Sequence, residues 1–451
     1  MSSSSPVPLH LTATRVAEYF RFGCERQLRY DLVPSERRGG EVPAPNADPA
    51  AGPLVGPRPG SALLTEAGRR WERRALKRLI ARVGAERVAF AGWRADGEPA
   101  RLRPERVAEL LRDPDGIDFL VQPELRLADP AAFLAEHGID PALVELAPAA
   151  PDLIRVRRGP QGQLRFQVVD IKASREARVP HFAQVAFYTL LLEAVCREAG
   201  VDAGLVDTRW ARVWARDGRG ARTFRLGAYR HHVRHFLQGE LPRLAALAPA
   251  VADWHVAPRC AGCAYLEHCR AEADRTDAVC RVAGLTPLAG RVLREKGIAT
   301  VAALAKSHRR DTWTGCHALE TDAELLKLRA QATAWKKLFE TRGTTQLMSA
   351  REDVRVILSA EGDPVSGRCF ALGVRVEGLG GRGGAEPHVF VAEAPTAAAE
   401  RTMLARLLAV VMDAFAAVER ANVERAGRPL SAHLYVWDRA ELAVLRELIE
   451  R

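Results

Sequence analysis

The chain has 451 residues, of which 47% are hydrophobic, so it is long enough for about two or three domains and too apolar for extended disorder. Lysine and arginine total 66 against 56 acidic residues, and the resulting net charge of +10 favours a polyanionic partner. No segment approaches the roughly 20 uninterrupted apolar residues that cross a bilayer, and residues 1–6 lack the features of a signal peptide. We therefore expect a globular, cytoplasmic protein without a membrane partner.

The predicted elements follow changes in composition along the chain. Residues 11–31 favour helices, and residues 34–60, rich in proline, glycine and alanine, favour a loop or linker. From about residue 61 to residue 270, helix and strand patterns are mixed, which indicates an α/β domain. We take residues 1–275 as the first domain.

Residues 276–345 form the second region and are predicted to be helical throughout. Two segments in it, residues 284–287 and 296–301, resemble the glycine-containing turns of helix-hairpin-helix modules, which commonly hold a nucleic-acid backbone. A purely structural helical spacer explains the same segments equally well.

The third region, residues 346–451, combines strands with one long helix. Strands are expected at residues 354–358, 370–376, 389–391 and 432–437, and the helix at residues 397–425.

Cysteines are clustered in the first region. Cys260, Cys263 and Cys269 form a C-x2-C-x5-C group more than two hundred residues after Cys24. In a reducing cytoplasm, clustered cysteines bind a metal or a cluster more often than they form disulfides. A four-coordinate metal or a cubane cluster needs a fourth thiolate, for which Cys24 is the best candidate and Cys280 the rival. Zinc and an iron–sulfur cluster both remain open for this site.

An Asp-x-Lys pair lies at the end of an apolar strand pattern. Strand periodicity over residues 164–172 puts Asp170 and Lys172 on the same face, so a carboxylate and an ammonium emerge together. Asp152 precedes a second apolar run, and a hairpin through residues 159–162 would bring the two strands alongside each other.

This arrangement predicts a site for a hard cation. Asp152 and Asp170 could bind one Mg2+ or Mn2+ ion through their oxygens, with the Ile171 carbonyl as a further ligand. Lys172 would position the attacking water or stabilise charge on the phosphoryl oxygens. A strand-end Asp-x-Lys seen alone is more often a solvated pair, so the prediction depends on the motifs occurring together.

A third acid, Glu72, lies on the predicted helix of residues 65–82, on the same face as Leu76 and Leu79. A carboxylate on an apolar face needs a partner. Metal ligation and a salt bridge to a neighbouring arginine are both open.

A helix is expected to open at His181, after the Asp-x-Lys strand. The i, i+4 spacing of Gln184 and Tyr188 places an amide and a phenol on one face, where they could contact the substrate strand or hold Lys172. An aromatic residue at that spacing also fits ordinary core packing.

In this order, the motifs resemble the RecB-type branch of the PD-(D/E)XK nucleases, particularly the iron–sulfur forms found in AddB and in CRISPR-associated RecB-like exonucleases. The resemblance covers roughly residues 11–270. It implies a restriction-endonuclease-like α/β core, DNA cleavage with Mg2+ or Mn2+, and a structural 4Fe-4S cluster that joins the two ends of the nuclease domain. It implies catalytic roles for Asp152, Asp170 and Lys172, substrate contacts for Gln184 and Tyr188, and cluster ligation by Cys24, Cys260, Cys263 and Cys269.

The sequence departs from this family pattern on the first helix. Many relatives carry a metal-binding histidine there, whereas here Gly68 is followed by Arg69, Arg70, Trp71 and Glu72. Glu72 is the candidate replacement as catalytic and metal-binding residue.

The third region resembles the ribonuclease H-like exonuclease fold. Such exonucleases carry an Asp-x-Glu metal pair on the first strand, where this chain has Ser359-Ala360-Glu361. The chain also stops at Arg451, before the elements that would supply the last acidic ligand. We expect a degenerate, truncated domain that docks or guides rather than cuts.

Two classes of function follow. The first is a DNA exonuclease or end-processing nuclease, acting on single strands or free ends in repair, recombination or defence. The second is a catalytically inactive DNA-binding or scaffold subunit of a helicase–nuclease complex. Retention of the catalytic motifs together favours the enzyme, with a helicase partner or self-association.

Overall fold

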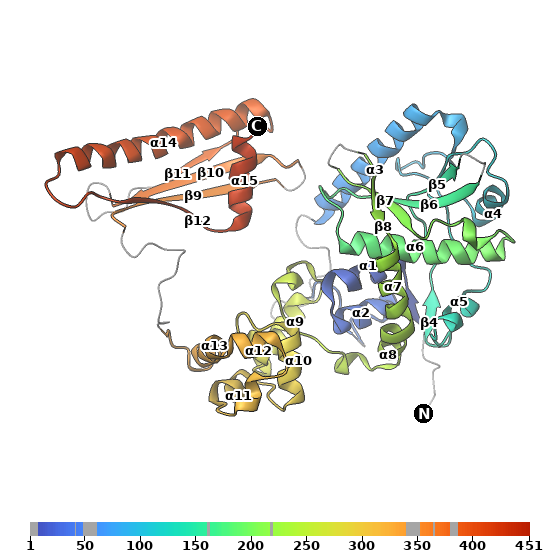
Figure 1. The fold of residues 1–451 in the computed structure, drawn as a ribbon, viewed down its shortest axis with the longest axis horizontal. Coiled ribbons are helices and arrows are strands. Elements are labelled where there is room, and N and C mark those ends of the chain that lie inside the picture. Colours follow the sequence, from blue (N-terminus) through green and yellow to red (C-terminus); the bar gives the residue numbers. More distant parts are fainter. Residues whose placement is uncertain are drawn as a thin grey trace. The chain divides into compact units, whose positions relative to one another are not determined.

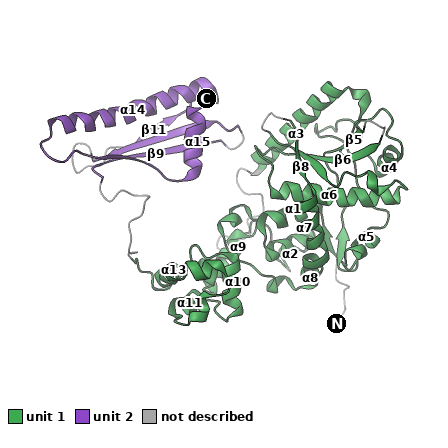
Figure 2. Ribbon diagram, in the orientation of Figure 1, with its two compact units in different colours: residues 1–339 green, residues 340–451 purple. Residues whose placement is uncertain are grey.

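The computed structural model describes residues 8–40, 42–47, 61–159, 163–216, 220–339, 352–363, 366–378 and 387–451. It divides into two units, residues 1–339 and 340–451 (Figure 2). Parts of the predicted organisation lie outside the described residues: residues 41 and 48–60 of the linker, the hairpin tip at 160–162, residues 340–345 of the helical region, and residues 346–351 of the third region.

The strands of the first unit are short. They are β1 (Leu9–Leu11), β2 (Val88–Ala89), β3 (Phe119–Val121), β4 (Val144–Leu146), β5 (Leu153–Arg158), β6 (Leu164–Ile171), β7 (Trp210–Trp214) and β8 (Arg222–Arg225). The α-helices described in this unit are α1 (Ala13–Phe22), α2 (Glu25–Leu32), α3 (Ser61–Val83), α4 (Pro104–Arg112), α5 (Pro130–Glu136), α6 (Val179–Glu198), α7 (Gly227–His235), α8 (Leu241–Ala246), α9 (Leu266–Arg275), α10 (Pro287–Glu295), α11 (Val301–Lys306), α12 (His317–Thr321) and α13 (Ala323–Trp335).

A mixed six-stranded sheet, in the order β2-β3-β5-β6-β7-β8, lies at the centre of the first unit. β5 pairs antiparallel with β6, with Leu153 opposite Val169, which confirms the predicted hairpin pairing. β6 then pairs parallel with β7. Helix α6 covers one face of the sheet and α3 covers part of the other (Figure 1).

The central strand β6 is buried on both faces because helices lie on both sides of it. Phe166 and Val168 belong to the core under α6, whereas Val169 and Ile171 pack with α3. This alternation follows from the two-residue period of a strand. The predicted first helix is also present, as α3, and it begins four residues before the expected start at Thr65.

Helix α6 has 20 residues and is long and apolar enough to cross a membrane by length and composition alone. However, 78% of its apolar window is buried inside the protein. Val185 and Phe187 are fully buried, and the helix packs against α1, α7 and the sheet. It is therefore a core helix of the first unit.

The predicted helix-rich segment at residues 11–31 forms α1 and α2. Val16 and Leu28 are fully buried in the same core as Phe187 of α6. β1 pairs parallel with β4, with Leu9 opposite Val144, in a separate two-stranded sheet. The start of the chain is thus part of the first domain's core.

Helices α10 to α13 enclose a separate hydrophobic core, to which Leu293, Leu304 and Leu326 contribute. Between α10 and α11 the chain turns at Gly297, whose φ of 79 lies in the left-handed region that favours glycine. Thr300 then caps α11 by accepting a hydrogen bond from the N–H of Ala303 at 3.1 Å. The helical character predicted for this region is confirmed over the described residues.

The second unit contains a four-stranded sheet in the order β11-β10-β9-β12. Its strands are β9 (Val354–Gly362), β10 (Cys369–Glu377), β11 (His388–Val391) and β12 (Ala432–Val436), and its helices are α14 (Ala397–Glu424) and α15 (Arg439–Ile449). β9, β10 and β11 form an antiparallel meander, and β12 runs parallel to β9.

The predicted strands and long helix of this unit are confirmed, but helix α15 was not expected from the sequence. Asp438, two residues after the end of β12, caps α15 by accepting a hydrogen bond from the Glu441 N–H at 2.9 Å. Both helices pack on one face of the sheet and bury Val356, Leu407 and Leu445.

Candidate active site

Asp170 and Lys172 lie together where β6 ends. The Asp170 side chain is only 2% exposed, and its Oδ2 lies 2.8 Å from the Lys172 ammonium nitrogen. That oxygen is buried and forms an ion pair with Lys172. The Lys172 N–H donates to the Trp214 carbonyl at 2.9 Å, which holds this strand end against β7.

Asp152 immediately precedes β5 and reaches across the hairpin to the end of β6. Its Oδ2 accepts a hydrogen bond from the backbone N–H of Ile171 at 2.5 Å. Part of Asp152 remains accessible, but protein atoms surround its carboxylate densely. Burial, followed by the charges of Asp170 and Glu72, therefore raises its pKa well above the ordinary value. The two aspartates predicted from the sequence thus lie at one end of the hairpin.

Gln122 joins this pair to Glu72. Its Nε2 donates to Glu72 Oε1 at 2.7 Å and to Asp152 Oδ1 at 3.0 Å. Gln122 follows β3 and has a φ of 48, in the left-handed region that residues other than glycine rarely adopt. Its backbone is therefore strained. Its own N–H donates to the Asp152 carbonyl at 2.9 Å, and this bond helps to hold the strained backbone.

Sequence reasoning missed Gln122. The available signal was a polar residue directly after the apolar run Phe119-Leu120-Val121 and before Pro123. Such a residue marks a strand end. The pairing of Gln122 with two acids distant in sequence could be seen only in the fold.

Glu72 projects from α3 toward this site. Burial, followed by the charge of Glu98, raises its pKa. The neighbouring arginines pair elsewhere: Arg73 binds Glu98 at 3.0 Å, and Arg70 binds Glu66 at 2.9 Å. Among the described residues no arginine forms an ion pair with Glu72, so its described hydrogen-bond partner is Gln122.

Three carboxylates and one ammonium therefore share the sheet end. For Lys172, burial lowers the pKa, but Asp170 and then Asp152 outweigh burial and raise it, so the ammonium is charged. The number of acids, Glu72, Asp152 and Asp170, exceeds the single positive charge of Lys172. Such an excess fits a hard divalent cation, which binds oxygen ligands. In the described residues no group of three or more His, Cys, Asp or Glu side chains is arranged to hold a metal ion.

Gln184 and Tyr188 of α6 face the aspartates. Gln184 Nε2 donates to Tyr188 Oη at 3.1 Å, and both residues are buried. Burial, followed by the charges of Asp170 and Asp152, raises the pKa of Tyr188 well above its usual value. The phenol is therefore neutral and able to donate a hydrogen bond.

His181, at the start of α6, is also near the site. Burial, and then the charge of Lys172, lowers its pKa to about 4. Its Nδ1 accepts a hydrogen bond from the Arg178 N–H at 3.1 Å, which caps the helix. The imidazole is therefore neutral at physiological pH. The sequence placed His181 at the helix start but gave it no role.

The four clustered cysteines line one cavity of about 20 Å³. Cys24 precedes α2, Cys260 and Cys263 lie on a short turn, and Cys269 is on α9. Burial raises the pKa of Cys263 and of Cys269 to about 12, and it also raises that of Cys24. Buried thiolates need a compensating cation, so the donor set fits a metal or cluster. Cys280 lines a different cavity.

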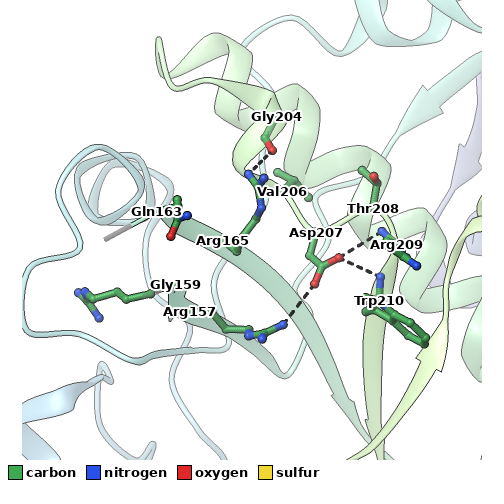
Figure 3. Close-up of a pocket in the computed structure, with 11 residues that line it drawn as sticks. Arg157, Gly159, Gln163, Arg165, Gly204, Val206, Asp207, Thr208, Arg209 and Trp210 are labelled. Atoms are coloured by element: carbon green, nitrogen blue, oxygen red, sulfur yellow. Dashed lines mark hydrogen bonds and ion pairs between the residues drawn. The ribbon is translucent and has the colours of Figure 1, made fainter. Parts of the chain in front are cut away.

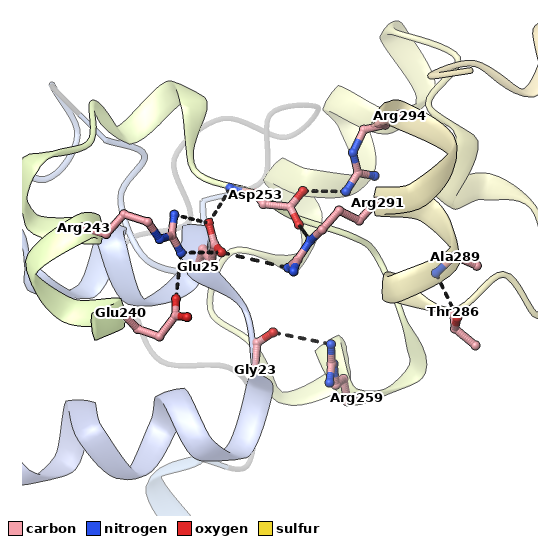
Figure 4. Close-up of polar contacts among 10 residues, drawn as sticks. All are labelled: Gly23, Glu25, Glu240, Arg243, Asp253, Arg259, Thr286, Ala289, Arg291 and Arg294. Atoms are coloured by element: carbon pink, nitrogen blue, oxygen red, sulfur yellow. Dashed lines mark hydrogen bonds and ion pairs between the residues drawn. The ribbon is translucent and has the colours of Figure 1, made fainter. Parts of the chain in front are cut away.

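Polar contacts connect this cysteine cavity to the helices that follow (Figure 4). Glu25, next to Cys24, pairs with Arg243 of α8 at 2.7 Å. Asp253 pairs with Arg291 at 2.9 Å and with Arg294 at 2.5 Å, both on α10. The side chains therefore tie α2, α8 and α10 together beside the cysteines.

The fold and site define a mixed α/β protein with an acidic centre at one end of its main sheet. Comparison with known families agrees: the model for the PD-(D/E)XK nuclease superfamily matches residues 54–270. This segment therefore matches a superfamily whose members are generally nucleases and typically use divalent metals such as Mg2+. No curated protein and no solved structure matches the chain. Cys24 and residues 271–451 lie outside the matched segment.

Proposed function

We propose that this protein is a metal-dependent deoxyribonuclease, an exonuclease or end-processing enzyme on single-stranded DNA that serves repair, recombination or defence. The observation that carries the proposal is a chain of contacts. Gln122 donates hydrogen bonds to Glu72 and to Asp152. Asp152 in turn accepts from the Ile171 N–H, and Ile171 lies between the paired Asp170 and Lys172. Three acids and a lysine, drawn from distant segments, meet at one strand end.

Each residue of the site has a role in this proposal. Asp152, Asp170 and Glu72, with the Ile171 carbonyl, would hold Mg2+ or Mn2+, which supplies charge neutralisation at the phosphate and a more acidic bound water. The Lys172 ammonium orients the attacking water or donates to a phosphoryl oxygen, where negative charge develops. Its ion pair with Asp170 keeps the ammonium aimed at the sheet end.

Gln184 and Tyr188 bind the substrate strand in the same proposal. The neutral Tyr188 phenol can donate to a phosphate oxygen, and the Gln184 amide fixes the direction of that phenol. Because both groups are uncharged and buried, they add no repulsion between the protein and a polyanion.

A degradation assay tests this function. End-labelled single- and double-stranded DNA should be cleaved with Mg2+ or Mn2+, and cleavage should stop with chelator. Lys77→Ala serves as a matched control for Lys172→Ala, because Lys77 is an exposed lysine on α3. Cleavage lost in Lys172→Ala and kept in Lys77→Ala supports the proposal.

The second candidate is a catalytically inactive DNA-binding or scaffold subunit. Two observations favour it: the first helix has Glu72 where relatives carry a metal-binding histidine, and in the described residues no acidic group is already arranged around a metal position. A purified protein that binds DNA but leaves it intact under both metals would select this alternative.

For the cysteine cavity we propose a structural 4Fe-4S cluster bound by Cys24, Cys260, Cys263 and Cys269. The four thiols line one cavity, and four thiolates are the number that a cubane cluster needs; zinc is the alternative. Anaerobically purified protein should be brown and contain iron. Colourless protein that contains zinc would select the zinc alternative.

For the second unit we propose a degenerate ribonuclease H-like domain without nuclease activity. The meander followed by a strand parallel to β9 supports this resemblance. Ser359 offers no carboxylate, and Glu361 is exposed on the face that α14 and α15 leave open. In this proposal the unit docks a partner, a helicase or a second copy of the chain.

A further inference from the structure

Helix α3 covers only part of its face of the main sheet, and the uncovered part is rich in arginine. On β5, the residues on this face after Leu153 are Arg155 and Arg157, because strand residues alternate between faces. Arg157 lies directly opposite Arg165 of β6 in the register of the hairpin. Like charges directly opposite each other destabilise a strand pair, so this pairing has a cost in the free protein.

The same face continues across β7 and to the end of α3. Arg212 of β7 is opposite Val169, which faces α3, and Arg82 occupies the last turn of α3. We call these residues, with Arg209, the arginine face; its members are Arg82, Arg155, Arg157, Arg165, Arg209 and Arg212.

Few acids compensate the arginine face. Asp207 lies 3.7 Å from Arg157, but Asp207 also accepts hydrogen bonds from Gln167 and from two backbone N–H groups. Within the described parts of the chain, no carboxylate forms an ion pair with Arg82, Arg155 or Arg212. The Nε of Arg212 is buried and has no hydrogen-bond partner.

The arginines are close enough to perturb one another. Burial, and then the charge of Arg157, lowers the pKa of Arg155. Burial, and then the charges of Arg155 and Arg157, lowers the pKa of Arg212. The pKa shifts agree with the geometry: the positive charge gathered here exceeds the negative charge of the nearby Asp207 and of Asp118, whose charge acts on Arg155.

A hollow of about 510 Å³ lies at the end of this face, between the β5–β6 hairpin and the segment before β7 (Figure 3). Arg157 and Arg165 line it, and Arg157 points toward Asp207. Trp210 forms one wall, with the Arg209 guanidinium 5.7 Å from its ring centroid. A planar aromatic group beside several guanidinium groups suits a sugar–phosphate backbone with exposed bases.

We propose that the arginine face binds the phosphate backbone of the nucleic acid outside the cleavage site, as a second contact surface. The choice of nucleic acid over another polyanion rests on the proposed nuclease function. From Asp152 to Arg157 the strand advances five residues, or about 17 Å at ~3.3 Å per residue. At ~3.4 Å per nucleotide along a duplex strand, this separation corresponds to about five nucleotides. Short substrates should therefore reach the active site without touching the arginine face.

The test is a triple variant, Arg82→Gln/Arg157→Gln/Arg209→Gln, in the full-length protein. All three residues are exposed, so the substitutions leave the core intact. The control replaces Arg103, Arg106 and Arg197, which are equally exposed and lie on α4, its N-terminal cap and the end of α6. Both variants change the net charge equally.

Binding of a single-stranded 20-mer is measured without divalent metal, over a series of salt concentrations. The triple variant should bind on the order of tenfold more weakly than wild type, and its log–log salt slope should fall by about 2. The control variant should lose much less affinity for the 20-mer. Cleavage of a trinucleotide substrate, which is shorter than this separation, with Mg2+ should be the same in all three proteins.

Equal 20-mer affinity in the triple variant and wild type, or an equal loss in the control, would overturn the inference. Its failure is distinct from failure of the nuclease proposal. A wild-type protein that binds the 20-mer through the arginine face but cleaves nothing keeps the inference and removes the nuclease. A wild-type protein that cleaves DNA, together with a triple variant that binds the 20-mer normally, removes the inference and keeps the nuclease proposal.

Discussion

The two sheets of this protein differ in how they are covered. In the first unit, most of β6 is buried on both faces, and its end carries Asp170 beside Asp152 and Glu72, two acids whose pKa values burial raises. In the second unit, β9 alternates between buried and exposed residues, because helices pack on one face only. Its Glu361 is exposed. A sheet covered on both faces can hold charged groups in a buried site, whereas a sheet covered on one face offers a surface.

The sharpest way to test this difference is to remove one ligand of the cluster proposed for the first unit. Cys24→Ala should lose iron and destabilise the first unit, on the order of several kcal/mol, because a bound metal or cluster contributes to folding. The second unit has its own core and should keep its thermal transition. Calorimetry should then show one transition lowered and one unchanged.

Cys280→Ala is the matched control, because Cys280 is buried but outside the four-cysteine cavity. It should keep both the colour and the iron content. Iron lost equally from the two variants would contradict the proposed ligand set.

The next effect concerns the acids at the end of β6. Asp170→Ala and Lys172→Ala should each lower cleavage by about 10³-fold, because each removes a charge placed at the reacting phosphate; Asp152→Ala should behave alike. DNA binding and the far-ultraviolet circular dichroism spectrum should change little. Asp170→Ala should not lower the melting temperature of metal-free protein, because it relieves repulsion with Asp152. Wild-type cleavage by these variants would refute the site.

Gln122 should have a smaller effect, since it touches the acids and not the substrate. Gln122→Ala removes the bridge between Glu72 and Asp152 and should reduce cleavage by about 10- to 100-fold, as is usual for groups that orient metal ligands. Glu72→Gln separates two roles for that residue. If Glu72 is a ligand, the variant needs more Mg2+ for half-maximal rate; an unchanged Mg2+ requirement would make it a structural residue.

The stability of the metal-free protein should depend on pH through Asp152. Its folded-state pKa is raised above the ordinary value of about 3.9, so the folded state binds the extra proton. The favourable contribution is present below about pH 4 and is lost as pH rises through the folded pKa. The melting temperature of the Asp152→Asn variant should therefore fall less than that of wild type as pH rises from about 5 to about 8. Added Mg2+ should reduce the wild-type loss, since it binds the ionised carboxylates.

The smallest effect is expected in the second unit. Glu361→Ala should leave cleavage unchanged, because Glu361 is exposed on an open sheet face. Ser359, on the same face of β9, offers no second carboxylate. The decisive background is Asp170→Ala. Residual metal-dependent degradation there that disappears with Glu361→Ala would make the second unit a nuclease and break the comparison.

Local patterns were enough to place the elements around the site. Strand alternation located β6 and its terminal Asp170, turn residues located the hairpin, and an amphipathic pattern located α3. These patterns follow from the periods of strands and helices, which depend on neighbouring residues in the sequence. Helix α15 was missed because its pattern begins only after the capping residue Asp438, near the end of the chain.

The sequence by itself determined which residue types are available: the aspartates, the lysine, the glutamate on the first helix and the clustered cysteines. Only the tertiary structure decided which of these residues lie close to one another. The bridge through Gln122, the neutral His181 beside Lys172 and the arginine face all join residues far apart along the chain. The physical reason is that burial and the charge of spatial neighbours set a group's pKa and its partners, and both are properties of packing rather than of local sequence.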